Sequence, residues 1–371
     1  MKIVIATTSG FHLRHLAREL IAVGHDVDYL TYLPSFRIRR DGIPAANASS
    51  YFWRLAPWSA AALFRYLPRL QNGAVQAMFS RADEAFAVNL PPCDAFIGLS
   101  AMADKCARVA RDRFGAKIVI ERGNAHVLEQ NELLVTGGGA PFPELYVARE
   151  LASYACADYI ALPSSHAVES FVERGFPREK IFKNMYGVDL GRFTPSRRPP
   201  GPLKLIYVGG WSFRKGCDVM TEVLRAAPEL SLTHVGLPLD MALPDLPNFR
   251  SIGYRPHAEL VREMARHHIL LLPSREDGFG MVLIEALASG LPVIGSSKTG
   301  APDLRELIAS GESVAIVPPA DPVALRDAIE DMARHVETQG DDRQILSKMD
   351  KVNLSWAAYA RRYSDFLQSI V

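Results

Sequence analysis

The sequence has little cysteine and no excess of charge, and both features exclude broad classes of function. It holds only four cysteines, none of them in a C-x-x-C pair or in a Cys/His cluster with zinc-ligand spacing. We therefore expect isolated buried thiols in a reducing compartment, with no disulfide framework and no metal site. Lysine and arginine together number 42, against 41 aspartates and glutamates. This balance argues against a general nucleic-acid-binding protein.

Long apolar runs are also missing. No stretch reaches the roughly eighteen consecutive apolar residues that a membrane-spanning helix needs. The N-terminal "MKIVIATTSG" carries one charge and a short apolar run, which does not fit a signal peptide. We therefore expect a cytoplasmic protein.

What the sequence does contain is a regular alternation of strand and helix patterns over 371 residues, a length typical of two domains. Residues 2–7 form a short β-branched run, and apolar residues from Leu13 to Ile21 then recur with helical spacing. Further strand patterns occur at "HDVDYLTYL", "DAFIGLS", "AKIVIE", "DYIALPS" and "KIFKNM". Such alternation predicts an α/β fold with a parallel sheet covered by helices on both faces.

A second series of six strand patterns follows the proline-rich segment 194–202, "TPSRRPPGP". We therefore predict two Rossmann-like doubly wound domains that face each other across a cleft. The predicted boundaries are 1–193, 194–352, and a final helix at 353–371 that packs back towards the first domain. Ligands of such sheets bind at the carboxyl ends of the strands, so the cleft is the expected site.

The stretch "PSREDGFGMVLIEALASGLPVIG", residues 273–295, places three carboxylates in unusual surroundings. Gly278, Phe279 and Gly280 lie between a strand and a helix, where free backbone N–H groups favour an anion. Glu285 lies within an apolar helix, so it must either form an ion pair or face the cleft, where a ribose could satisfy it. Glu276 and Asp277 precede the glycines, and adjacent side chains of an extended segment point to opposite sides.

The loop "YVGGWSFRKGCD", residues 207–218, brings Arg214 and Lys215 to the carboxyl edge of the second sheet. It fits neither G-x-G-x-x-G nor the Walker pattern. A basic loop at this position is a candidate for binding an anionic ligand, although a solvated surface loop has the same composition.

Together these motifs resemble the retaining glycosyltransferases of sequence family four, which have the GT-B fold. The "VG…KG" loop matches at Lys215, and the family's E-x7-E motif matches with Asp277 and Glu285. "YGVDLGRFTP", residues 186–195, is similar to the family's hinge, and "TGAPDLRELI" to its following loop. Two departures are the glycine at 210, where the family has an arginine, and the aspartate at 277 in place of glutamate.

The resemblance implies a role for each matched residue. Lys215, with Arg214 as the second cation, would bind the donor diphosphate, Asp277 would bind the sugar, and Glu285 would bind the ribose. His126 would face the donor sugar from the first domain. The implied donor-binding set is completed by Gly209, Tyr254 and the Gly278 to Gly280 segment, and the acceptor-side loop by Ser9 and Gly10. A structural role remains open for His126 and is favoured for Glu150.

The expected function is therefore metal-independent, retaining transfer from a nucleotide-diphosphate sugar, with no other cofactor, to a glycan, lipid-linked or small-molecule acceptor. Residues 51–70 interleave aromatics and arginines, which suits either peripheral contact with the inner face of a membrane or a buried helix pair. Open alternatives are a nucleotide-sugar epimerase, a catalytically degenerate sugar-nucleotide-binding subunit, a phosphorylase and an exported solute-binding protein.

Overall fold

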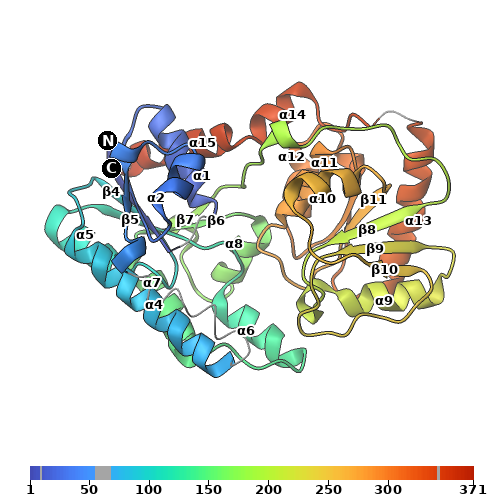
Figure 1. The fold of residues 1–371 in the computed structure, drawn as a ribbon, viewed down its shortest axis with the longest axis horizontal. Coiled ribbons are helices and arrows are strands. Elements are labelled where there is room, and N and C mark those ends of the chain that lie inside the picture. The colour runs from blue at the N-terminus through green and yellow to red at the C-terminus, as the bar shows by residue number, and fades with distance from the viewer. Residues whose placement is uncertain (9–10, 55–67, 341–342) are drawn as a thin grey trace.

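A computed structural model describes residues 1–8, 11–54, 68–340 and 343–371 (Figure 1). Within these residues the chain forms two parallel sheets with helices packed against them. The predicted fold class is thereby confirmed.

The N-terminal sheet has seven strands in the order β3-β2-β1-β4-β5-β6-β7. Their bounds are β1 (Lys2–Thr7), β2 (Asp26–Thr31), β3 (Ala48–Ser50), β4 (Ala95–Leu99), β5 (Lys117–Glu121), β6 (Tyr159–Leu162) and β7 (Ile181–Lys183). The helices of this half are α1 (Leu13–Ala22), α2 (Ser35–Arg40), α4 (Pro68–Val88), α5 (Asp104–Phe114), α6 (Val127–Thr136), α7 (Glu144–Cys156) and α8 (Ser165–Val172). Sequence patterns predicted every one of these strands except β3, a short polar strand at the edge of the sheet.

The C-terminal sheet has six strands in the order β10-β9-β8-β11-β12-β13. Their bounds are β8 (Lys204–Val208), β9 (Ser231–Val235), β10 (Phe249–Ser251), β11 (Ile269–Leu272), β12 (Val293–Ser296) and β13 (Val314–Val317). The helices are α9 (Cys217–Ala226), α10 (His257–Met264), α11 (Met281–Ala288), α12 (Ala301–Leu307), α13 (Pro322–Thr338), α14 (Lys348–Asn353) and α15 (Trp356–Ile370). All six strands lie where the sequence patterns predicted them.

The central strands are buried because helices cover both faces of each sheet. Residues 3–6 of β1 and 269–272 of β11 are at most 2% exposed. Such strands read as continuous apolar runs, without the alternation of a half-exposed strand. The sequence patterns are strong here for this reason.

Strand order reverses between β1 and β4 in the first sheet, and between β8 and β11 in the second. At such switch points the loops that leave adjacent strands diverge and open a crevice. The loops after β8 and β11 contain Lys215 and Asp277 respectively. Topology alone therefore brings together two motifs that lie about sixty residues apart in the sequence.

The last helix, α15, returns to the N-terminal domain and lies beside α1 (Figure 1). Tyr359 donates a hydrogen bond to Oε1 of Glu121 at 3.0 Å, and Ser364 lies 2.8 Å from Nε2 of His25. The chain thus crosses between the domains a second time. Across the ranges that the structure describes, no helix is both long and apolar enough to span a bilayer.

Candidate active site between the two domains

A cavity of about 860 Å³ lies between the two domains. The C-terminal domain contributes Met281, Glu285 and His257 to its wall, and α15 contributes Trp356. The rest of the wall comes mainly from the N-terminal domain and the connection between the domains, including His12, Arg14, His15, Arg18, Arg40, Ser100, Arg122, Gly123, Asn124, Tyr186 and Arg192. The cavity therefore lies where the two switch points predict a ligand.

Glu285 is the carboxylate that α11 presents to this cavity. No described residue donates a hydrogen bond to it or forms an ion pair with it. Burial raises the pKa of Glu285 to about 7, since charge is costly away from water. A partly buried carboxylate that faces a cavity and lacks a protein partner is suited to accept hydrogen bonds from a ligand, such as the hydroxyls of a ribose.

Lys215 and Asp277 meet across the crevice between the loops after β8 and β11. The ammonium group of Lys215 forms an ion pair with Oδ2 of Asp277, while Oδ1 accepts a hydrogen bond from the backbone N–H of Gly280 at 3.1 Å. Burial acts to raise the pKa of Asp277, but the charges of Lys215 and Arg214 outweigh it and hold the pKa below its ordinary value. Asp277 therefore both binds the start of α11 and neutralises Lys215.

Glu276 points away from Asp277, as the alternation of an extended segment requires. It is fully buried and accepts hydrogen bonds from Ala125 N at 3.1 Å and Gln130 Nε2 at 2.8 Å, both in the N-terminal domain. It also pairs with Arg214 at 2.9 Å. Glu276 therefore joins the domains, and the guanidinium group expected to act as the second cation is bound to it here.

The glycine segment 278–280 packs closely against the N-terminal domain. A Cβ at Gly278 would collide with the carbonyl oxygen of Gly123, and Ser164 donates a hydrogen bond to the Gly278 carbonyl at 2.5 Å. Phe279 is 1% exposed and its ring lies 5.8 Å from that of Tyr186. The side chain of Phe279 therefore packs in the core, and Gly278 allows close contact between the domains.

His126, predicted to face the donor sugar, is not among the residues that line the cavity. It is the N-cap of α6, where its Nδ1 accepts a hydrogen bond from Leu128 N at 3.3 Å. Its ring packs against Tyr154 and Phe171 at 5.1 and 4.9 Å. Burial, followed by the charge of Arg174, lowers its pKa to about 4. The structural alternative therefore describes this histidine.

Other predicted positions lie at the margin of the site or beyond it. Tyr254 is 70% exposed in the turn between β10 and α10, and the Gly209 carbonyl lies 2.9 Å from Nε2 of His234. Neither lines the cavity. Ser9 and Gly10, and residues 55–67 of the proposed membrane segment, lie outside the described residues. Glu150, for which a structural role was favoured, is buried and pairs with Arg122 at 2.6 Å, although both also border the cavity.

Sequence patterns did not predict the part of the cavity wall that is formed by α1 and α15. His12 lies 3.0 Å from Oε2 of Glu121, and His15 stacks on Trp356 with ring centroids 4.4 Å apart. These residues belong to no motif, because two segments more than three hundred residues apart bring them together. The only signal in the sequence was their position just after the first strand.

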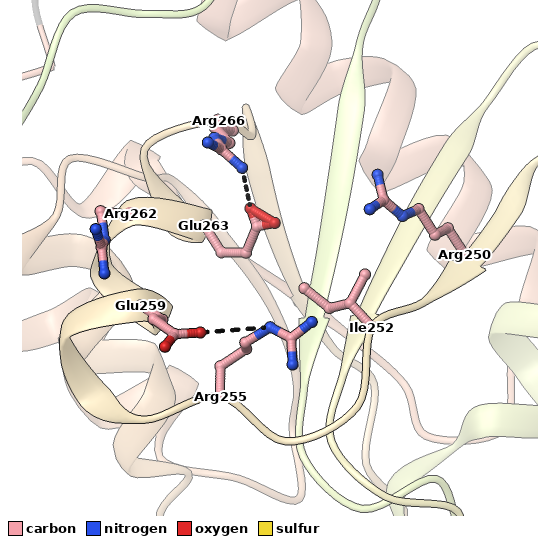
Figure 2. Close-up of a pocket in the computed structure, with 7 residues that line it drawn as sticks. All are labelled: Arg250, Ile252, Arg255, Glu259, Arg262, Glu263 and Arg266. Atoms are coloured by element: carbon pink, nitrogen blue, oxygen red, sulfur yellow. Dashed lines mark hydrogen bonds and ion pairs between the residues drawn. The ribbon is translucent and has the colours of Figure 1, made fainter.

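A smaller cavity of about 320 Å³ lies within the C-terminal domain, between β10 and α10 (Figure 2). Its arginines include Arg255 and Arg266, which pair with Glu259 at 3.7 Å and Glu263 at 3.3 Å. Its described lining residues all come from the C-terminal domain, and its arginines lie beside an edge strand, where charge discourages sheet-to-sheet association. We therefore assign the functional site to the interdomain cavity. The described residues contain no cluster of metal-ligating side chains.

Two glycosyltransferase family models match this chain. "Glycosyl transferase 4-like domain" matches residues 7–184, and "Glycosyl transferases group 1" matches residues 202–335. The first match contains β2 to β7 of the N-terminal sheet, and the second contains all six strands of the C-terminal sheet.

Curated relatives include a glycogen synthase of Mycobacterium tuberculosis, 31% identical over 38% of this chain and 37% of its own length. The putative colanic acid biosynthesis glycosyltransferase WcaL of Escherichia coli is 31% identical over 37% of this chain and 39% of its own length. The chain thus spans well under half the length of these two relatives. Among solved structures, Anabaena HepE in complex with UDP and glucose covers the whole chain with a TM-score of 0.66 and 14% identity, which shows the common fold.

Proposed function

Because this chain belongs to the glycosyltransferases of sequence family four, with the GT-B fold, we propose that it transfers a sugar from a nucleotide-diphosphate sugar to an acceptor hydroxyl. The observation that carries this proposal is Glu285, a partly buried carboxylate without a protein partner among the described residues at the wall of the interdomain cavity. In the proposal its oxygens accept hydrogen bonds from the ribose hydroxyls of the donor. The UDP in the HepE structure, a protein of the same fold, supports a nucleotide donor.

Lys215 has the proposed role of stabilising the leaving diphosphate. As the bond between the sugar carbon and the phosphate oxygen breaks, negative charge grows on that oxygen, and a nearby ammonium group lowers the barrier. The ion pair with Asp277 holds Lys215 in place before the donor binds. On donor binding, Asp277 would exchange this contact for sugar hydroxyls, which frees Lys215 for the diphosphate.

We propose transfer with retention of configuration and without a metal ion. A bond forms between the sugar carbon and the acceptor oxygen on the face that the diphosphate leaves, and the departing phosphate oxygen takes the acceptor proton. No side chain is needed as general base. The acceptor is proposed to be a glycan, a lipid-linked sugar or a small molecule, in keeping with a relative that is named for polysaccharide biosynthesis.

Binding of a panel of UDP, GDP, ADP and TDP sugars, measured by thermal shift on the wild type and on Glu285→Gln, tests the donor assignment. A ligand at about 100 times its Kd stabilises the folded state by roughly 2.7 kcal/mol, so the preferred donor should be distinct. We expect the shift to shrink in Glu285→Gln. Equal shifts for the two proteins would contradict the ribose contact.

The same panel separates the alternatives. An epimerase would change the sugar on the nucleotide without an acceptor, and a degenerate subunit would bind the donor but never release free nucleotide diphosphate. Release of nucleotide diphosphate that depends on Lys215 is the outcome expected of a transferase.

A further inference from the structure

The N-terminal wall of the interdomain cavity carries a group of arginines that the proposed donor site does not use. Arg14 and Arg18 lie four residues apart on α1 and so share one face of the helix. Arg40 is the last residue of α2. The chain just after it lies close to Arg18, because a Cβ built at Gly42 would be 3.0 Å from Cδ of Arg18. All three arginines line the cavity. We refer to Arg14, Arg18 and Arg40 as the arginine wall.

The carboxylates nearby do not fully neutralise the arginine wall. Arg14 reaches Asp41 only at 3.4 and 3.5 Å, which is long for a charge-assisted hydrogen bond. Arg18 pairs with Glu19 at 2.7 Å, and no described carboxylate lies within ion-pair distance of Arg40. Three guanidinium groups therefore share two carboxylates at this end of the cavity.

The charged groups around His15 indicate the sign of the electrostatic potential at this end of the cavity. The His15 ring lies flat on Trp356, with an angle of 5° between the ring planes. Burial is the main cause that lowers the pKa of His15 to about 3, and the charges of Arg14, Arg18, His12 and Arg192 contribute in the same direction. The arginines around His15 therefore outweigh Asp41, Glu19 and the pairing of Arg192 with Asp189 at 2.7 Å, and this end of the cavity is positive.

We propose that the acceptor of this enzyme carries a phosphate group, and that the arginine wall binds it. A guanidinium group presents paired N–H donors that match phosphate oxygens, and a tetrahedral phosphate has enough oxygens for three such groups. A planar carboxylate offers only two oxygens. The arginine wall and Glu285 line the same cavity, so a donor at α11 and an anionic acceptor at α1 would share one space.

This inference rests on the proposed function, since it concerns the acceptor of the proposed transfer. The two can nevertheless fail separately, because phosphate binding is measurable without a donor and without turnover. Phosphate binding with no nucleotide-sugar binding would contradict the proposed function and keep the arginine wall as an anion site. Transfer of the sugar to neutral acceptors only would keep the proposed function and contradict the arginine wall as a phosphate site.

The experiment titrates the protein with inorganic phosphate and with glucose 6-phosphate, followed by ³¹P NMR and calorimetry, and compares glucose and glucuronate. Wild type is measured beside Arg14→Gln and Arg40→Gln. Arg250→Gln is the matched control, because Arg250 lines the separate cavity of Figure 2 and forms no ion pair with a described residue. The thermal shift by the nucleotide donor checks that each variant is folded.

We expect the Kd for glucose 6-phosphate to rise about tenfold or more in Arg14→Gln and in Arg40→Gln, the loss of roughly one charge-assisted contact, and to stay unchanged in Arg250→Gln. Glucose should bind far more weakly than glucose 6-phosphate. Absence of phosphate binding by the wild type, or equal losses in all three variants, would overturn the proposal. Glucuronate that binds as tightly as glucose 6-phosphate would show that the phosphate assignment is wrong.

Discussion

At the scale of single residues, Lys215 and Glu285 carry the proposed chemistry in opposite electrostatic settings. Lys215 is held by a carboxylate until a ligand displaces it, whereas Glu285 has no protein partner among the described residues. A partly buried charge without a partner lowers stability, and residues of this kind are concentrated at ligand sites. The two residues therefore lead to different predictions.

For Lys215→Ala we expect kcat/KM to fall by about 10²–10³, because one charge-assisted contact with the leaving group is lost. The substitution also leaves Asp277 without its ion-pair partner, so the melting temperature should fall slightly. The double variant Lys215→Ala with Asp277→Asn removes the unpaired charge and should recover stability without recovering activity. Lys117→Ala, at an exposed position on β5, is the control. Normal kinetics of Lys215→Ala would count against the diphosphate contact.

The stability effect of Glu285 depends on pH with a definite sign. Its pKa rises from an ordinary value of 4.5 in the unfolded chain to about 7 in the folded protein. The folded state therefore holds more protons between these values, and its stability falls as pH rises from 4.5 to 7. Glu285→Gln should accordingly be more stable than wild type at pH 8, by at most about 3 kcal/mol, and equal to it below pH 4.5.

Denaturant unfolding of both proteins at pH 4, 6 and 8 measures this difference. If Glu285→Gln raised the free energy of unfolding by the same amount at all three pH values, the carboxylate would not be titrating. If it raised it by nothing at pH 8, the carboxylate would be solvated.

At the scale of elements, the loop between β11 and α11 divides its adjacent acids between two tasks. Asp277 accepts a hydrogen bond from Gly280 N and pairs with Lys215, while Glu276 accepts hydrogen bonds from the N-terminal domain. The sequence predicted that the two acids diverge. It did not predict the destination of Glu276, since Ala125 and Gln130 are distant in sequence.

We therefore expect Asp277→Asn and Glu276→Gln to behave differently. Asn at 277 can still cap α11, so Asp277→Asn should keep the fold and reduce transfer. Glu276→Gln leaves Arg214 without its buried partner, which should cost about 1–3 kcal/mol of stability and raise KM through weaker contact between the domains. Melting temperature, kcat and KM for the two variants side by side check this. The reverse pattern would place Glu276, and not Asp277, at the sugar.

The strands show most clearly what the sequence can specify. Buried central strands such as β1 and β11 are apolar throughout and were predicted correctly, whereas β3 is short, polar and partly exposed and was missed. His126 illustrates a different point, since a histidine after a strand suits a ligand contact by residue type, whereas here its Nδ1 caps a helix. A residue type constrains chemistry, but tertiary contacts decide which group faces the cavity.

At the scale of the whole molecule, the cavity exists because the two sheets oppose their switch points and α15 returns to the first domain. Sequence motifs predicted Glu285 of the C-terminal wall well, since it lies in a local pattern, and they also singled out Lys215 and Asp277, which pair with each other but do not line the cavity. They did not predict the N-terminal wall, where His15 meets Trp356 through packing of the two ends of the chain.

Transfer should survive chelation, because the ammonium group of Lys215 can neutralise the diphosphate without a divalent cation. We expect equal rates with and without EDTA, measured as release of nucleotide diphosphate. Complete loss of transfer in EDTA, restored by Mn²⁺ or Mg²⁺, would contradict metal independence.

The central claim is that the interdomain cavity transfers a sugar from a nucleotide donor with retention. The most direct test follows the anomeric proton of the first product by ¹H NMR, with the α-linked nucleotide sugar that gives the largest thermal shift. Glucose 6-phosphate serves as acceptor, and water does so in a parallel sample. Retention predicts that the α-anomeric signal appears first, and that it is lost in Lys215→Ala. An initial β-anomeric signal, or turnover that persists unchanged in Lys215→Ala, would contradict the claim.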